Sequence, residues 1–365
     1  MAYKAIPVTA AQVSGSHSDF PVYIKPSAMT GWEALTLAEA ESIRFYSDEA
    51  KTTELAREVV SADEIHVKVG TFDDSTTIYA DYDGIRADYA TDATYGAENV
   101  WNNGYVAVYH MKEGSGTTLA DSTANGFDGT LTHTTLWNSE KKFQNSLKQP
   151  NHNEIVNLPD ISGEFDNEAT FTGWLKSDGT NGDDHRAVFL LGLEEGAGSH
   201  YFFRGDTDSR HFVGMFRDSR DITWTPSGVT RTDWNKITIT TKPGSNNYKY
   251  YINGVLRSQV DGQSTISSGT SISIFAVQSF GRSTGLFAEK YQITSFYQDD
   301  NWITTEYNNQ NDVASFWGTV TDVEEPAPSA TLGLKLGSTT INKVMLGSTE
   351  IKKVYLGTTV IYENL

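Results

Sequence analysis

The 365-residue sequence contains no cysteine. Disulfide bridges, thiolate zinc sites and cysteine nucleophiles are therefore excluded. Positive charge is also scarce, because 28 Lys and Arg residues stand against 47 Asp and Glu residues and give a formal net charge of −19. An electrostatic field of that sign repels phosphate backbones and anionic lipid surfaces, so we expect no nucleic-acid partner.

Long apolar runs are missing as well. No stretch approaches the roughly 20 apolar residues that cross a bilayer, and the N-terminal residues lack a basic region followed by an apolar segment. We therefore expect no membrane insertion, and synthesis in the cytoplasm with release by lysis or as part of a particle. The composition, 38% hydrophobic and 12% aromatic, is ample for the buried cores of two or three domains.

What the sequence does contain is a repeated alternation of apolar and polar residues, in short runs separated by Gly, Asn, Asp and Ser. This pattern predicts antiparallel strands, for example over 20–24 and 236–240. Asn253-Gly254 lies between two such runs and predicts a two-residue hairpin, because both residues tolerate positive φ. A helix is expected only around 35–42, with one short helical turn near 300–308.

A change of composition separates the body of the chain from its end. Segment 321–330 lacks hydrophobic periodicity and contains Pro326 and Pro328, which favour an extended spacer. Segment 331–365 then repeats with a ten-residue period, and each unit predicts a short strand with a Gly-Ser or Gly-Thr turn.

A β-meander as small as 331–365 is marginally stable alone. We therefore expect this tail to complete its core against another subunit or another protein. Docking back onto the sandwich of the same chain is the alternative. The candidate assembly residues are the apolar residues of the repeats: Ile341, Val344, Ile351, Val354, Tyr355 and Ile361.

Several motifs resemble known families. Asp19-Phe20-Pro21-Val22, Ser42-Ile43-Arg44-Phe45-Tyr46 and Ile65-His66-Val67-Lys68 resemble the DUF2341 family, although His66 stands where that family usually has tryptophan. Trp101 to Met111, Phe171-Thr172-Gly173-Trp174 and Asn301 to Asp312 resemble the concanavalin A-like, or laminin-G-like, lectin sandwiches. The Leu-Gly-Ser/Thr repeats resemble the tails that end various tailed-bacteriophage virion proteins.

These resemblances imply an all-β protein in four parts. A small N-terminal β-sandwich of DUF2341 type would span 1–100, and a concanavalin A-like jelly-roll sandwich would span 101–320. The proline-containing linker would occupy 321–330. A short C-terminal β-meander at 331–365 would serve as the assembly or attachment module.

Sandwiches of this kind are mostly binding modules for sugars or proteins. The resemblance implies that Asp121 is either a calcium ligand or a turn-capping aspartate, with Glu289 as its partner in the calcium case. Calcium, which prefers oxygen ligands, is the one cofactor that these residues suggest. For carbohydrate, aromatic rings would stack on sugar C–H faces beside polar side chains that bond hydroxyls. The candidates are Trp137, Tyr201, Arg217 and Trp224, and a core or rim role is the alternative for each.

Catalysis has one candidate segment, Glu164-Phe165-Asp166-Asn167-Glu168. On a strand, this spacing would place the three carboxylates on one face, where Glu164 and Glu168 could act as nucleophile and general acid. A loop is expected here instead, so we assign no catalytic residue and expect no enzymatic activity.

Together these features predict a structural protein of a tailed-bacteriophage virion. It would be a surface-displayed tail appendage, fibre or receptor-binding protein with lectin-like carbohydrate adhesion. Its expected partners are other virion proteins, copies of itself in a homo-oligomer such as a trimer, and a host surface glycan or protein receptor. A capsid decoration protein, a polysaccharide depolymerase that uses Glu164 and Glu168, and a cellular lectin-like adhesin are the alternatives.

Overall fold

The computed structural model describes most of the chain. The described residues are 3–150, 154–178, 186–187, 189–191, 202–205, 212–216, 220–224, 229–230, 232–262, 272–275, 285–324, 335–336, 339–340, 344–346, 349–351, 353–356 and 359–363. For the short strands between 186 and 224 and beyond 335, only the backbone is described. Strands in antiparallel sheets dominate, which confirms the all-β expectation.

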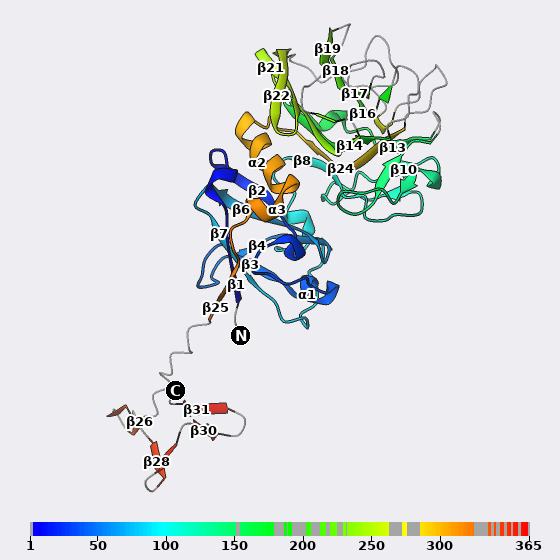
Figure 1. Ribbon diagram of the computed structural model, residues 1–365. Helices are drawn as coiled ribbons and strands as arrows, with labels where there is room; N and C mark the ends of the chain where they lie inside the picture. The colour runs from blue at the N-terminus through cyan, green and yellow to red at the C-terminus, as the bar shows by residue number, and fades with distance from the viewer. Residues whose placement is uncertain are drawn as a thin grey trace.

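The N-terminal unit contains two sheets that enclose one apolar core (Figure 1). The first sheet has the order β25 (Thr321–Val323), β1 (Tyr3–Pro7), β7 (Thr77–Asp81), β3 (Arg44–Tyr46), β4 (Glu54–Leu55). The second has the order β2 (His17–Ile24), β6 (Glu64–Phe72), β5 (Arg57–Ser61). Helix α1 (Leu37–Ser42) begins at a capping box in which Thr36 and Glu39 bond each other's backbone N–H.

The central unit is a larger sandwich. Its main sheet has the order β11 (Trp137–Asn138), β12 (Ser146–Lys148), β24 (Leu286–Thr294), β14 (Ala169–Ser177), β20 (Asn235–Thr241), β21 (Gly244–Ile252), β22 (Val255–Gly262), and β8 (Tyr105–Tyr109) also pairs with β24. The opposing sheet has the order β16 (Phe189–Leu191), β23 (Ile272–Ile274), β13 (Val156–Leu158), β10 (Gly129–Leu131), β9 (Thr118–Leu119). Buried residues of both sheets, such as Phe171 and Val156, share one core.

Further strands and turns complete this unit. A four-stranded sheet has the order β15 (Arg186–Ala187), β17 (Phe202–Gly205), β18 (Phe212–Phe216), β19 (Arg220–Trp224). Strands β21 and β22 meet at Asn253 and Gly254, whose φ angles are +54° and +73°. The hairpin predicted from this dipeptide is confirmed. The short 3-10 helices are η1 (Ala10–Gln12), η2 (Pro26–Ala28), η3 (Ala97–Asn99), η4 (Thr134–Leu136) and η5 (Ser162–Glu164).

After the sandwich the chain returns to the N-terminal unit. Helix α2 (Asp300–Asn311) is 12 residues long, where only a short turn was expected, and α3 (Val313–Phe316) follows it. Trp302, Phe316 and Trp317 are buried in the N-terminal core. Figure 1 shows both orange helices beside the blue strands, and β25 running next to β1. The first three residues of the expected linker 321–330 are therefore a strand of the N-terminal sheet.

The tail strands pair in twos wherever the structure describes them. The pairs are β26 (Lys335–Leu336) with β27 (Thr339–Thr340), β28 (Val344–Leu346) with β29 (Thr349–Ile351), and β30 (Lys353–Leu356) with β31 (Thr359–Glu363). Among the assembly candidates, Ile341 lies outside the described residues, and the side chains of Val344, Ile351, Val354, Tyr355 and Ile361 lie outside the description. Of the helices that are described, none has the length and apolarity needed to span a bilayer.

Candidate functional site

The N-terminal unit and the sandwich meet along a buried seam. Strand β6 is covered on both faces, because Ile65 and Val67 pack in the N-terminal core while Glu64 and His66, which point the other way, are also buried. On the neighbouring strand β5, Glu58 is the register partner of His66. The polar face of this small sheet therefore faces the sandwich instead of solvent.

Three ionisable side chains surround Glu64 at this seam. Lys290 Nζ donates to Glu64 Oε1 at 2.7 Å, and His110 Nδ1 lies 3.2 Å from the same oxygen. Lys290 Nζ also lies 3.1 Å from His66 Nε2. Because Lys290 and His110 come from the sandwich and Glu64 and His66 from the N-terminal unit, these contacts join the two units.

Glu58 extends the network. Its Oε2 accepts hydrogen bonds from Trp101 Nε1 at 2.6 Å and His110 Nε2 at 2.9 Å. Its Oε1 accepts from Ser122 Oγ at 2.7 Å. With only 4% of its surface exposed, Glu58 is held by donors at both oxygens, which is the condition for keeping a buried carboxylate charged.

The protonation states follow from these neighbours. Burial lowers the pKa of His110, but the carboxylates of Glu58 and Glu64 outweigh burial and raise that pKa above its ordinary value. Burial raises the pKa of Glu58, but His110 outweighs it and holds the pKa at about 2. Burial and the ammonium of Lys290 lower the pKa of His66 to about 3, so this ring is neutral. The cluster thus balances two carboxylates with two cations.

A β-bulge directs Lys290 into the seam. The pairing of β14 with β24 shifts between Thr172 and Trp174, so two residues of β24 lie opposite Gly173. Lys290 has φ of +55°, a left-handed conformation that such a bulge allows. A Cβ on Gly173 would lie 2.9 Å from Tyr291 Cε1, so the bulge also requires glycine at this position.

Glu64, His66 and His110 are also the one group among the described residues whose ligand atoms lie close enough to hold a metal, within 4.8 Å of one another. Lys290 Nζ, however, bonds Glu64 and His66 within this group. An ammonium therefore already neutralises the site, and the donor set does not fit a metal ion. We interpret the cluster as a structural ion-pair network.

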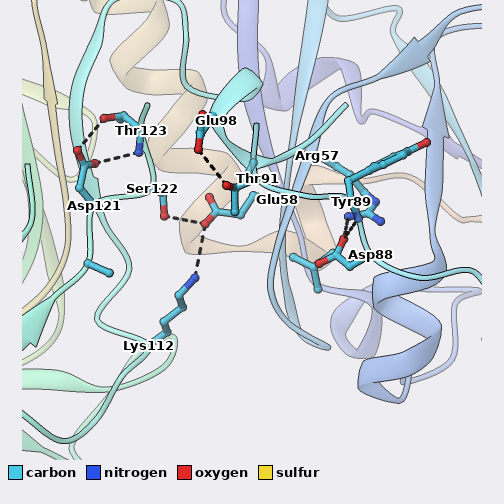
Figure 2. A pocket seen from close by; sticks show the side chains of 13 residues that line it. Arg57, Glu58, Asp88, Tyr89, Thr91, Glu98, Lys112, Asp121, Ser122 and Thr123 are labelled. Atoms are coloured by element: carbon cyan, nitrogen blue, oxygen red, sulfur yellow. Dashed lines mark hydrogen bonds and ion pairs between the residues drawn. The ribbon is translucent and has the colours of Figure 1, made fainter. Parts of the chain in front are cut away.

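A polar cleft of about 330 Å³ opens beside this network (Figure 2). One wall comes from the N-terminal unit and its connection to the sandwich, and includes Arg57, Asp88 and Glu98; the other comes from the sandwich and includes Lys112 and Asp121. Tyr89 adds an aromatic ring. Carboxylates, hydroxyls, an ammonium and a ring in one concave surface can bind a small polar ligand.

Some polar side chains of the cleft are held by hydrogen bonds within the protein, and others can still form hydrogen bonds with a ligand. The Arg57 guanidinium donates to Asp88 Oδ1 and to the carbonyl oxygens of Ile43 and Glu41, each at 2.6 Å. Glu98 Oε1 accepts from Thr91 Oγ1 at 2.9 Å. Lys112 is less constrained, because its side chain is 44% exposed and its Nζ lies 3.9 Å from Glu58 Oε1.

The two predicted calcium ligands occupy different places. Asp121 lines the cleft, and its two oxygens accept from Thr123 Oγ1 and from the backbone N–H groups of Val108, Thr123 and Phe127, at 2.7–3.0 Å. This is the turn-capping geometry given above as its alternative role. Glu289 instead accepts from the backbone N–H groups of residues 142, 143 and 144 at 2.6–2.8 Å. Neither belongs to the metal-binding group described above, and calcium stays a prediction.

Of the carbohydrate candidates, only Trp137 has a described side chain. It is half-buried, packs against the sandwich core, and donates its Nε1–H to the carbonyl oxygen of Gly116 at 2.9 Å. Trp224 ends strand β19, but its side chain lies outside the description, and Tyr201 and Arg217 lie outside the described residues. The structure does not bring Trp137 into the cleft.

The candidate catalytic segment does not lie on a strand. Glu164 ends the 3-10 helix η5, and Glu168 precedes strand β14. Glu168 Oε2 accepts from the backbone N–H of Tyr297 at 3.1 Å. The alternation that would place Glu164 and Glu168 on one face therefore does not apply.

Sequence reasoning missed Glu58, His110, Lys112 and Lys290. A signal was present in β6, where Glu64, His66 and Lys68 alternate with apolar residues. That alternation was compatible with an ordinary solvent-facing side, and only the tertiary structure places the polar face against a second unit.

Comparison with known proteins agrees with the fold of the central unit. A family model for the concanavalin A-like lectin/glucanases superfamily matches residues 151–289, so the central sandwich has the lectin-like fold. No curated protein resembles the sequence closely enough to count as a match. The chain is similar to the binding domain of botulinum neurotoxin DC in complex with rat synaptotagmin II, at 14% identity and a TM-score of 0.46, covering 57% of this chain and 52% of that one. It is similar to Trypanosoma rangeli sialidase in complex with sialic acid, at 10% identity and a TM-score of 0.46, covering 68% and 43%. The chain thus spans about half of these structures or less.

Proposed function

We propose that this protein is a non-enzymatic, carbohydrate-binding structural protein displayed on the virion of a tailed bacteriophage, as a tail appendage, fibre or receptor-binding protein. The observation that carries the proposal is the polar cleft of about 330 Å³ at the seam between the N-terminal unit and the lectin-like sandwich. Its hydroxyls, carboxylates and ammonium suit the many hydroxyl groups of a host surface glycan.

Two sequence features support the virion location and the assembly. The ten-residue repeats at 331–365 resemble tails of virion proteins, and small strand pairs of this kind gain stability from a partner. We expect the tail to attach the protein to other virion proteins or to further copies of itself. The N-terminal unit, which resembles the DUF2341 family, together with the sandwich would then face the host.

The non-enzymatic part of the proposal draws support from Glu164 and Glu168. A retaining glycosidase needs two carboxyl groups held about 5 Å apart across the scissile bond. Here Glu164 lies on an exposed 3-10 turn and Glu168 bonds a backbone N–H, so neither is held on a strand facing a cleft.

The test combines location with activity. Immunogold labelling of purified phage particles should place the protein on the particle surface, and the full chain should bind host envelope polysaccharide without releasing new reducing ends. Absence from the particles would favour the cellular adhesin. New reducing ends that disappear in Glu164→Gln would establish the depolymerase instead.

A further inference from the structure

We propose that the seam cleft binds a sugar unit that carries no negative charge, either a neutral or an amino sugar, and discriminates against sialic and uronic acids. This inference rests on the proposed carbohydrate binding and specifies the chemical class of its ligand. It follows from which groups of the cleft are already bonded, which retain bonding capacity, and what net charge surrounds them (Figure 2).

The floor of the cleft is a fixed negative charge. Glu58 lines it, and its carboxylate is held by Trp101, His110 and Ser122 from three directions. Because three donors from residues 101–122 hold both carboxylate oxygens, the carboxylate cannot turn away when a ligand enters. A second carboxylate placed near it would meet a charge that the protein cannot move.

The N-terminal wall offers hydrogen-bond acceptors. Asp88 uses Oδ1 for Arg57 Nη1 and for the backbone N–H of Tyr89, and its side chain is 39% exposed. Glu98 uses Oε1 for Thr91. The second oxygen of each carboxylate has no hydrogen-bond partner among the described residues, so a ligand bound here must present donors. Sugar hydroxyls and ammonium groups are donors, whereas a ligand carboxylate is not.

The opposite wall offers one adaptable donor. The Nζ of Lys112 carries three protons, and its nearest charged partner is Glu58 Oε1 at 3.9 Å. A hydroxyl or ring oxygen that entered between them could accept from this ammonium while a neighbouring hydroxyl donates to Glu98. A pyranose, which has both kinds of group around one ring, can satisfy both walls at once.

The net charge around the cleft determines which class of sugar binds more tightly. The described lining residues include the four carboxylates Glu58, Asp88, Glu98 and Asp121 and the two cations Arg57 and Lys112. The protonated His110, which bonds Glu58, compensates one of these carboxylates, so an excess of one negative charge is left around the cleft. A ligand carboxylate would add to this negative excess in a partly desolvated space, where repulsion is stronger than in water. An amino group would reduce the excess.

The experiment uses the full chain on an array of neutral, amino and acidic oligosaccharides, followed by calorimetry on the best neutral or amino ligand and on its sialylated or uronate counterpart. We expect the acidic counterpart to bind at least about tenfold more weakly. Glu98→Gln should lower the affinity for the ligand without negative charge about fivefold or more. It should also reduce the difference in affinity between that ligand and its acidic counterpart. Lys112→Gln should lower the affinity for both ligands. Lys176→Gln, which removes a cation outside the cleft, is the matched control and should change neither affinity.

Three results would overturn the inference. The first is preference for the acidic member of each pair. The second is glycan binding that neither Glu98→Gln nor Lys112→Gln alters, which would place the glycan site elsewhere and leave the proposed function intact. The third is absence of binding to every sugar on the array, which would also count against the proposed carbohydrate binding. Unchanged melting temperatures of the variants show that each result reports on the cleft.

Discussion

At the residue scale, Glu58 connects the stability of the protein to its candidate binding site. The same carboxylate bonds His110 within the seam and lines the cleft. A buried charge is costly unless its neighbours compensate for lost water, and here a cation and two neutral donors do so. The architecture of the cleft therefore depends on a network that includes residues outside its lining, such as Trp101 and His110.

Replacing Glu58 by Gln should destabilise the protein strongly. The protonated His110 would lose its closer carboxylate and remain buried, and breaking one side of a buried pair costs about 3–5 kcal/mol. The matched control is Glu140→Gln, which breaks the more exposed pair of Glu140 with Lys176 and should cost about 0–1 kcal/mol. Urea unfolding of the three proteins measures both values. Equal losses would show that the seam network contributes no more than a surface ion pair.

Glu289 should make the free energy of unfolding depend on pH. Burial raises its pKa to about 7, against three backbone N–H groups that lower it, whereas in the unfolded chain the group titrates near 4.5. Between these values the native carboxyl binds a proton that the unfolded carboxyl has lost, so this group's contribution falls as pH rises from about 4.5 to about 7.

Glu289→Gln replaces this carboxyl by a neutral amide that still offers one acceptor oxygen. Relative to the variant, the original protein should lose on the order of 3 kcal/mol of stability between pH 4.5 and pH 7.5. The pKa of His110 is also shifted by folding, but His110 is present in both proteins and its contribution cancels in the difference. Parallel curves of unfolding free energy against pH would contradict the prediction.

At the scale of elements, the return of the chain to its N-terminal unit is the feature that sequence reasoning did not find. The motif at 301–312 was recognised, but as the end of the sandwich. Its low overall apolarity hid the fact that α2 forms a three-turn helix whose Trp302 enters the N-terminal core. Helix length and the partner of a buried face depend on tertiary contacts, which local pattern does not contain.

Other elements could be predicted because one local cause determines them. The hairpin at Asn253-Gly254 follows from positive φ, and the helix around 35–42 follows from the Thr36 and Glu39 capping box. The cleft could not be predicted, because its lining residues lie on separate segments between 57 and 123, and among them the sequence motifs single out only Asp121 as a candidate ligand. The bulge that directs Lys290 likewise arises from pairing between β14 and β24.

Two truncations test whether the returning segment belongs to the N-terminal fold. Cutting after Val323 removes only the spacer and the tail, so the body should keep its melting temperature. Cutting after Asn311 also removes Val313, Phe316 and Trp317 from the N-terminal core, together with the strand that pairs with β1. Because loss of a single buried Phe or Trp side chain costs about 3–5 kcal/mol, this shorter chain should unfold or melt far lower. Similar melting curves for the two truncations would show that the segment is dispensable.

At the scale of the whole molecule, charge and assembly oppose each other. Each copy carries a formal charge of −19, so copies brought together repel one another. The tail strands, which pair only in twos where they are described, have the small size that favours completion by a neighbour. Association through the tail would keep the contact small and separate from the negatively charged body.

The full chain should therefore form an oligomer such as a trimer, and the chain cut after Val323 should be a folded monomer. Light scattering coupled to gel filtration measures both masses. Because the repulsion between copies is screened over about 10 Å at 0.1 M salt and over about 30 Å at 0.01 M, the oligomer of the full chain should dissociate more readily at low salt. An identical oligomer after the cut would show that the contact lies in the body. An oligomer that low salt strengthens would show that opposite charges, and not apolar tail residues, hold the copies together.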